Sequence, residues 1–253
     1  MGLEIINATG NARLNAPSVR LPASLTGARG FFAMGGDVAA SGRNRVLGRQ
    51  SERGVAVGAP VPNAGYTRFQ HQVNFLQTPM DETAVFTVAG IFRAPAAFPT
   101  TADRPIFFGN QASGTGARGS LLLFQSYTET TMAILGSSVY DTGTGSTVFG
   151  NTQILNVPNP LGWKLVIWVV STARRDLWNM TDNSTFGAGE TRARLVDTTN
   201  KIRLGSAHTA ANAGGASDIC NLIYLPNVAA SEAQRTDITT FLRADAALVG
   251  ITA

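Results

Sequence analysis

Short apolar runs separated by turns dominate the chain from about residue 66 onward. The runs have the length and the content of branched and aromatic residues that are typical of β-strands, and no helical pattern alternates with them. Residues 163–171 form the most apolar run, which indicates a strand buried on both faces. We therefore expect an antiparallel β-sandwich. The expected strands are residues 69–75, 84–92, 106–108, 121–127, 131–135, 163–171, 177–180, 201–205 and 218–225.

One helix is expected near the end of the chain. Ser231 is a favourable N-cap residue, and Gln234 follows it by three positions, so the two can form a capping box. Ile238, Phe241 and Leu242 then recur at the spacing of one helix face. The pattern predicts one short C-terminal helix with an apolar stripe.

Residues 1–65 differ from the rest of the chain. They are rich in Gly, Ala and Arg and contain few large apolar side chains, so they bury little core by themselves. We divide the chain into this N-terminal segment and a jelly-roll sandwich over residues 66–253. The segment is either an attachment arm, whose residues 13–21 add to the sheet edge of a neighbour, or a set of peripheral strands of the same sandwich. The arginines of such an arm would meet an acidic partner surface; they are Arg43, Arg45, Arg49 and Arg53.

Composition excludes several classes of protein. Only 14% of the 253 residues are charged and the net charge is +4, whereas an average protein has roughly 25% charged residues. No apolar run approaches the ~18 residues of a membrane span, so we expect no membrane insertion. The basic residues are scattered, so we expect no direct nucleic-acid binding. The N-terminus lacks the basic and apolar regions of a signal peptide, which predicts synthesis in a cytosol.

Cysteine and histidine are scarce. Cys220 is the only cysteine, which excludes a disulfide-built domain, and its apolar strand predicts a buried thiol. The two histidines are His71, expected on a strand surface, and His208, in a polar loop. One cysteine and two histidines are too few ligands for a zinc site within one chain.

A set of short motifs follows one order along residues 66–250. The matching segments are residues 86–92, 163–170, 177–180 with the turn at 182–183, 202–205, 219–225 and 231–234. This ordered set resembles the concanavalin A-like jelly roll, in its laminin G-like branch. Residues 1–65 lie mostly outside the resemblance.

Domains of this kind recur in tailed bacteriophages and phage-like particles as fibres, spikes, baseplate parts and head decoration proteins. The resemblance therefore implies a virion structural protein that is assembled in the host cytoplasm. Its expected partners are other particle proteins and further copies of itself in a homo-oligomer. The low-charge surface, rich in Thr and Gly, is consistent with a protein that packs against many neighbours.

Catalytic carboxylates were sought because the glycoside-hydrolase branch of this fold carries Glu-x-Asp pairs on one strand, at the separation that acid–base catalysis requires. None of the six glutamates has that spacing; they are residues 4, 52, 82, 129, 190 and 232. We therefore expect no enzyme activity. The alternative is a polysaccharide-degrading enzyme of the tailspike type, with a dispersed carboxylate site.

A candidate glycan site surrounds Trp178. This residue alternates with Asp176 on one strand face, beside the turn at Asp182 and Asn183. An aromatic ring suits the apolar face of a sugar, and polar neighbours suit its hydroxyl groups. We assign these four residues and His208 to a site for host surface polysaccharide. The alternative is that Trp178 fills the sandwich core.

Calcium is the metal that the resemblance implies. It binds several carboxylate, amide and carbonyl oxygens. Asp176, Asp182 and Asp218 lie in or beside expected loops and are the candidate calcium ligands. The alternative is that they form ordinary Asx turns. No other cofactor is expected.

Overall fold

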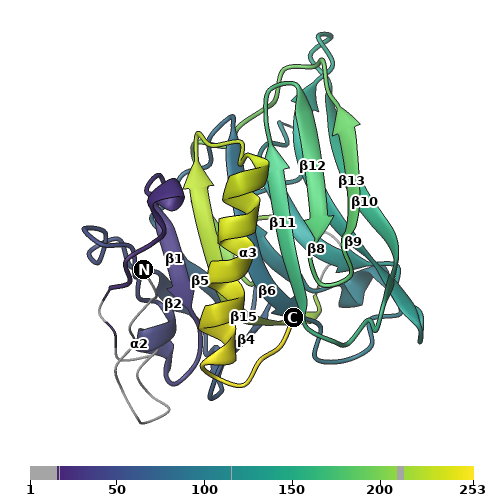
Figure 1. Ribbon diagram of the computed structural model, residues 1–253. Helices are drawn as coiled ribbons and strands as arrows, with labels where there is room; N and C mark the ends of the chain where they lie inside the picture. Colours follow the sequence, from purple (N-terminus) through teal and green to yellow (C-terminus); the bar gives the residue numbers. More distant parts are fainter. Residues whose placement is uncertain (1–15, 17, 115, 210–213) are drawn as a thin grey trace.

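The computed structural model describes residues 16, 18–114, 116–209 and 214–253, and they form two antiparallel β-sheets packed face to face (Figure 1). The first sheet has the strand order β13-β12-β11-β6-β15-β4-β3, and β1 pairs with β15 outside this path. The second sheet has the order β10-β9-β8-β7-β14-β5-β2. The predicted antiparallel β-sandwich is therefore confirmed.

The bounds of the elements are as follows. The strands of the first sheet are β1 Gly30–Ala33, β3 Val61–Pro62, β4 Thr67–Gln70, β6 Phe86–Arg93, β11 Lys164–Val170, β12 Arg174–Asn179, β13 Ser184–Gly189 and β15 Ala216–Pro226. The strands of the second sheet are β2 Val55–Val57, β5 Phe75–Gln77, β7 Ile106–Gly109, β8 Ser120–Gln125, β9 Thr131–Asp141, β10 Thr147–Pro158 and β14 Arg203–Leu204. The helical segments are η1 Ala23–Leu25, α2 Val38–Ser41, η2 Thr101–Asp103 and α3 Glu232–Ala247.

The main apolar core lies between the sheets. Trp168 of β11 points into it and packs edge-on against Phe86 of β6, with the ring centroids 5.3 Å apart. Gly136 of β9 lies opposite the indole, and a Cβ there would overlap the ring, so glycine makes room for the tryptophan. Cys220 is buried, as predicted.

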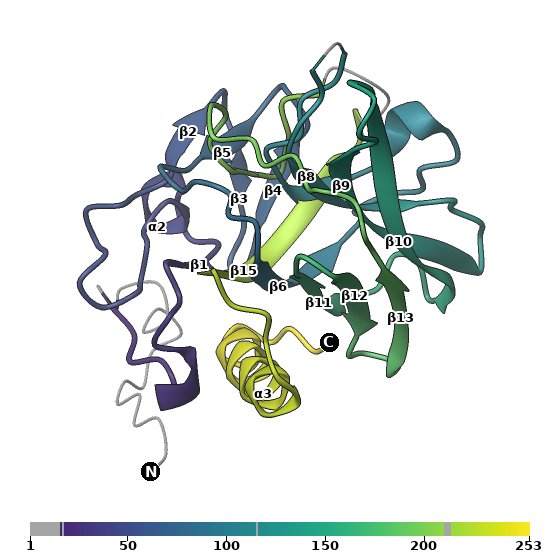
Figure 2. The same ribbon diagram turned by 90° about the horizontal axis from the view of Figure 1, so that it is seen from above.

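A second apolar layer covers the outer face of the first sheet. Ile167 of β11 and Ile223 of β15 belong to one buried cluster with Ile238, Phe241 and Leu242 of α3. Figure 2 shows α3 on the side of this sheet that faces away from the second sheet. Strand β11 is buried along its whole length between the two layers, as its apolar run predicts.

The C-terminal helix begins where the sequence predicts. The Ser231 hydroxyl accepts a hydrogen bond from the backbone N–H of Gln234, and the Gln234 side chain accepts one from the backbone of Ser231. This reciprocal pair satisfies N–H groups that the first turn of a helix leaves free. No helix in the described ranges is long and apolar enough to cross a membrane.

Residues 18–65 contribute strands and covering segments. Strand β1 pairs with β15, and Phe31 of β1 packs edge-on against Phe241 of α3 with the ring centroids 4.8 Å apart. Strands β2 and β3 lie at one edge of the second and first sheets, respectively. Within residues 18–65, strands β1, β2 and β3 therefore belong to the two sheets of the sandwich. Residues 1–15 and 17 lie outside the described residues, and they include residues 13–15 and 17 of the predicted docking segment 13–21.

The sequence did not predict strand β10, and strand β9 is longer than predicted. They pair as a hairpin from Thr147 opposite Asp141 to Pro158 opposite Thr131. Buried positions alternate with exposed or half-exposed ones from Phe149 to Leu155, and the exposed or half-exposed face carries two polar residues, Asn151 and Gln153, and two apolar ones. Because the polar residues 151–153 interrupt both faces of β10, it lacks the continuous apolar run that identified the other strands.

Candidate functional site

Trp178 and Asp176 face the α3 side of the first sheet, so their predicted alternation on one face is correct. The indole is half-buried and packs against the apolar cluster beneath α3. The guanidinium of Arg235, from α3, lies 4.2 Å from the ring centroid. Asp176 accepts a 2.6 Å hydrogen bond from Arg174. Protein groups therefore occupy one ring face and one carboxylate oxygen of the predicted glycan site.

Asp182 and Asn183 shape the turn between β12 and β13. The Asp182 carboxylate accepts hydrogen bonds from the backbone N–H and the hydroxyl of Ser184. Asn183 has a φ of 59°, in the left-handed region that asparagine tolerates better than most residues. Both residues thus have the local role of an Asx turn.

Asp218 does not lie in a loop. It is fully buried in β15 and bridges two arginines, with Oδ1 2.8 Å from Nε of Arg68 and Oδ2 2.7 Å from Nη2 of Arg93. Arg93 in turn lies 4.6 Å from the ring centroid of Trp163. Two guanidinium groups are the counter-charges that a buried carboxylate needs.

The candidate calcium ligands do not come together. Within the described residues, no group of three or more His, Cys, Asp or Glu side chains could hold a metal ion. Asp176 pairs with Arg174, Asp182 caps its own turn and Asp218 pairs with two arginines. The sequence spacing placed these residues near expected loops, but it carried no information about their arginine partners.

The two histidines lie at the segment that follows β14. His208 is half-buried, with its backbone N–H bonded to the carbonyl of Gln111 and its Nε2 3.0 Å from the carbonyl of Lys201. The structure therefore does not bring it beside Trp178, which lies under α3. His71 is buried, contrary to prediction, because Ser206 and Thr209 contact its two ring nitrogens. Burial lowers the pKa of both imidazoles.

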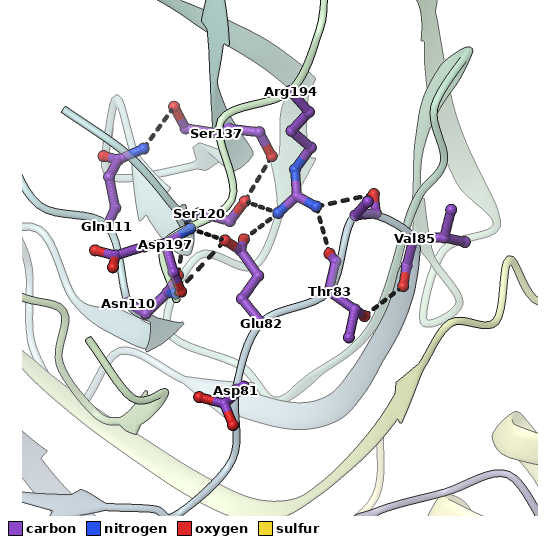
Figure 3. Close-up of polar contacts among 12 residues, drawn as sticks. Asp81, Glu82, Thr83, Val85, Asn110, Gln111, Ser120, Ser137, Arg194 and Asp197 are labelled. Atoms are coloured by element: carbon purple, nitrogen blue, oxygen red, sulfur yellow. Dashed lines mark hydrogen bonds and ion pairs between the residues drawn. The ribbon is translucent and has the colours of Figure 1, made fainter. Parts of the chain in front are cut away.

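A buried polar network joins the loops at one end of the second sheet (Figure 3). Glu82 is enclosed and forms an ion pair with Arg194. The second Glu82 oxygen accepts a 3.0 Å hydrogen bond from the backbone N–H of Asp197. Arg194 also donates to the Ser120 hydroxyl at 2.8 Å. Burial raises the pKa of Glu82, although Arg194 opposes the shift. Because both carboxylate oxygens are engaged, the network has a structural role.

The same network fixes a polar surface beside it. Asn110 donates from its side chain to the carbonyl of Asp197 at 3.1 Å, and the next residue, Gln111, directs its amide to the hydroxyl of Ser137 at 3.5 Å (Figure 3). Ser137 of β9 lies opposite Asn151 of β10 on the outer face of the second sheet. The network therefore stiffens the support of the exposed side of β10.

The outer side of β10 carries an aromatic ring aligned with two amides. Phe149, Asn151 and Gln153 alternate along this face, which we call the β10 face. The Phe149 side chain is 48% exposed, Asn151 is exposed and Gln153 is half-exposed. In the described part of the chain, neither amide side chain makes a hydrogen bond, so both can donate to and accept from a ligand.

The β10 face combines an aromatic ring with polar side chains, the combination that the sequence predicted around Trp178. It lies on a strand that the sequence did not predict. An exposed ring offers an apolar contact, and planar amides fix the orientation of hydroxyl groups. No pattern in the sequence marks this face, because Thr152 is buried whereas Phe149 and Leu155 are exposed.

Comparison with known proteins supports the fold. No protein-family model matches the sequence, and no curated protein matches it. A mutant of Trypanosoma rangeli sialidase displaying trans-sialidase activity is a similar solved structure, with a TM-score of 0.58 and 12% sequence identity over 92% of this chain and 35% of that chain. The receptor binding domain of botulinum neurotoxin D is another, with a TM-score of 0.52 and 7% identity over 87% of this chain and 55% of that chain.

The chain thus spans about one third of the sialidase and just over half of the toxin domain. At these identities the likeness shows a shared all-β sandwich fold and no more. It agrees with the jelly-roll architecture expected from the sequence motifs. The laminin G-like assignment and the phage setting stay predictions.

Proposed function

We propose that the protein is a non-catalytic glycan-binding module that serves as a structural component of a phage or phage-like particle. The observation that carries the glycan-binding part is the β10 face, where the exposed ring of Phe149 shares one strand face with the free amides of Asn151 and Gln153. A rigid strand presents them, because β10 pairs with β9 along most of its length.

Surface carbohydrate of a host cell is the proposed ligand. One structurally similar protein is described as a receptor binding domain and another as a sialidase, so this type of sandwich occurs in proteins that act at receptors and sugars. The particle setting rests on the motif resemblance and on the low content of charged residues. In that setting the chain forms homo-oligomers and contacts other particle proteins.

A screen of the full chain on an array of bacterial surface polysaccharides tests the binding function. We expect binding to at least one polysaccharide, and we expect a double substitution, Asn151→Ala with Gln153→Ala, to weaken it by about tenfold because each lost hydrogen bond contributes about 0.5–1.5 kcal/mol. A matched control replaces two exposed polar residues elsewhere, Thr236→Ala with Thr240→Ala on α3. Absence of binding to every polysaccharide would contradict the proposal.

The non-catalytic part is supported by the state of the buried carboxylates. Glu82 pairs with Arg194, Glu190 with Arg175, and Asp218 with Arg93. Each carboxylate is thereby held in a structural ion pair. We expect no release of reducing ends when the protein is incubated with the polysaccharides that it binds. Accumulation of reducing ends would instead support the alternative, a tailspike-type enzyme with a dispersed site.

The particle role has its own test. Mass spectrometry of purified particles from the source culture is expected to find the chain together with capsid or tail proteins. Light scattering after size-exclusion chromatography is expected to show a homo-oligomer. A monodisperse monomer that is absent from particles would contradict this part of the proposal and leave glycan binding intact.

A further inference from the structure

Strand β2 forms a free edge of the second sheet. Its register with β5 places Val55 opposite Gln77 and Val57 opposite Phe75. Among the residues that the structure describes, no strand lies along its other side. Figure 2 shows β2 at the margin of the sandwich, on the side away from β10. The outward backbone N–H and C=O groups of such a strand can pair with another chain.

The strands at the other ends of the two sheets are less accessible to a partner. Strands β10 and β13 lie beside each other where the two sheets meet, so each limits access to the edge of the other. Strand β3 contains Pro62 and follows Pro60, and proline has no N–H group to donate to a new strand. Residues 54–58, around β2, include neither a proline nor a charged residue. Because proteins generally block free edges with such residues, the unblocked edge of β2 indicates a partner.

Exposed valines surround this edge. Val55 and Val57 lie on β2, Val61 lies on β3, and Val73 lies in the turn between β4 and β5. Each of these side chains is between 39% and 65% exposed. Gly58 lies against the turn, because a Cβ there would be 2.1 Å from the carbonyl oxygen of Val73. We call the four valines the β2 patch. Grouped apolar side chains on the surface are typical of protein interaction sites.

The sequence of β2 is complementary to itself. Residues 54–58 read Gly-Val-Ala-Val-Gly in both directions. In an antiparallel pair of two copies centred on Ala56, Val55 of each copy lies opposite Val57 of the other. These side chains share one face of the sheet, where cross-strand apolar pairs stabilise the pairing. Ala56 packs toward the core of its own copy, so it does not obstruct the partner.

We propose that β2 pairs with β2 of a second copy of this chain, in an antiparallel dimer with two-fold symmetry. The two seven-stranded sheets then continue into each other. A two-fold interface requires the same surface on both copies, and the palindromic strand provides it. This inference identifies the contact surface of the homo-oligomer in the proposed function, and it rests on that part of the proposal.

Charge does not oppose this pairing. Arg53 is the nearest charged residue to β2 along the chain. In a pair centred on Ala56, Arg53 of one copy lies opposite Ala59 of the other, six positions from the second Arg53. At about 3.4 Å per residue the two arginines are roughly 20 Å apart. That separation exceeds the Debye length of about 8 Å at physiological ionic strength, so their repulsion is screened.

Light scattering after size-exclusion chromatography, at rising concentrations of the full chain, tests the pairing. We expect the unchanged chain to form a dimer. Val55→Lys places a charge on the edge strand and is expected to weaken the dimer by tenfold or more. The control is Leu248→Lys, which adds the same charge at a 43% exposed residue after α3 and should leave the dimer unchanged. Thermal unfolding checks that both variants are folded.

A cysteine pair tests the register. In the proposed dimer, Val55→Cys of one copy lies opposite Val57→Cys of the other, with the Cα atoms about 4.5–5.5 Å apart, which a disulfide can span. Two Val55→Cys copies are offset by two residues, so their Cα atoms are about 8 Å apart, which is too far. With oxidised glutathione as the acceptor of the two electrons, we expect the mixture to cross-link and neither variant alone. Cys220 is buried, so the unchanged chain is the blank.

Three results would overturn the β2 pairing. If Val55→Lys forms the same oligomer as the unchanged chain, or each cysteine variant alone cross-links as well as the mixture, the homo-oligomer uses another surface. If deletion of residues 1–15 abolishes the oligomer and the mixture does not cross-link, the N-terminal segment of a second copy occupies the edge instead. A monomer at every concentration contradicts the homo-oligomer of the proposed function as well. Glycan binding is then judged separately on the polysaccharide array.

Discussion

For Trp178, the sequence predicts which face of its strand the side chain occupies but not which residues contact it. Its alternation with Asp176 is visible in the sequence, and the structure confirms that both face one side of β12. The sequence separation of 57 positions hid the partner that covers the indole, Arg235 of α3. Ligand-binding residues that are predicted from local spacing alone can be wrong for this reason, because an element distant in the sequence can cover the face that would contact the ligand.

Replacing Trp178 therefore tests packing. We expect Trp178→Ala to lower the free energy of unfolding by about 2–3 kcal/mol, since a fully buried Trp or Phe costs about 3–5 kcal/mol and this ring is half-buried. Arg235→Ala, which removes the cation–π contact and a 3.0 Å hydrogen bond to the carbonyl of Ala230, is expected to cost about 1–2 kcal/mol. Denaturant unfolding measures both values. Equal stability of Trp178→Ala and the unchanged chain would show that the indole does not support α3.

Glu190 links stability to acid pH. Its oxygens bond to Arg192 at 2.7 Å and to the buried Arg175 at 2.9 Å. Hydrogen bonds from Arg192 lower its pKa from 4.5 to about 2. A carboxylate with a depressed pKa in the folded state stabilises the fold above its unfolded pKa, and this contribution disappears as the pH falls from about 4.5 toward about 2.

Glu190→Gln is expected to remove that acid-sensitive contribution. At neutral pH it leaves Arg175 buried without its counter-charge, which costs about 3–5 kcal/mol. The control is Asp176→Asn, whose partner Arg174 is 60% exposed, so its loss should cost at most about 1 kcal/mol. The measurement is the free energy of unfolding between pH 7 and pH 2. The same pH dependence in Glu190→Gln as in the unchanged chain would contradict the role assigned to Glu190.

At the scale of elements, the sequence predicted those strands that contain a continuous apolar run. Strand β11 and the capped helix α3 were predicted because burial on both faces and a capping box leave direct marks in the sequence. Strand β10 was not predicted, because the polar residues 151–153 interrupt its apolar positions. The β10 face was therefore hidden by the polar residues that make it a candidate site.

The placement of strand β1 predicts that this part of the N-terminal segment unfolds together with the sandwich. Phe31 is fully buried against Phe241, so Phe31→Ala should cost about 3–5 kcal/mol. For a chain of this size that corresponds to a fall in the melting temperature of roughly 10 °C. The exposed Leu47→Ala, in the loop between α2 and β2, is the matched control and should change it little. A melting temperature unaffected by Phe31→Ala would mean that β1 is not part of the cooperative unit.

For the whole molecule, the fold class followed from the sequence, but the β10 face and the β2 patch did not. Strand spacing and the absence of alternating helices predict a sandwich, because these features depend on local patterns. The β10 face needs the pairing of β9 with β10, and the β2 patch needs β2 to lie at an edge of the second sheet with Val73 beside it. Both depend on contacts that no local pattern specifies.

The most direct test of glycan binding compares two phenylalanines with the same exposure. Phe149 on the β10 face and Phe186 on β13 are each 48% exposed, so replacing either by alanine removes a similar amount of apolar surface. On an array of bacterial surface polysaccharides, Phe149→Ala is expected to weaken binding by about tenfold, and Phe186→Ala to leave it unchanged. Equal binding by the two variants would contradict a glycan site on the β10 face.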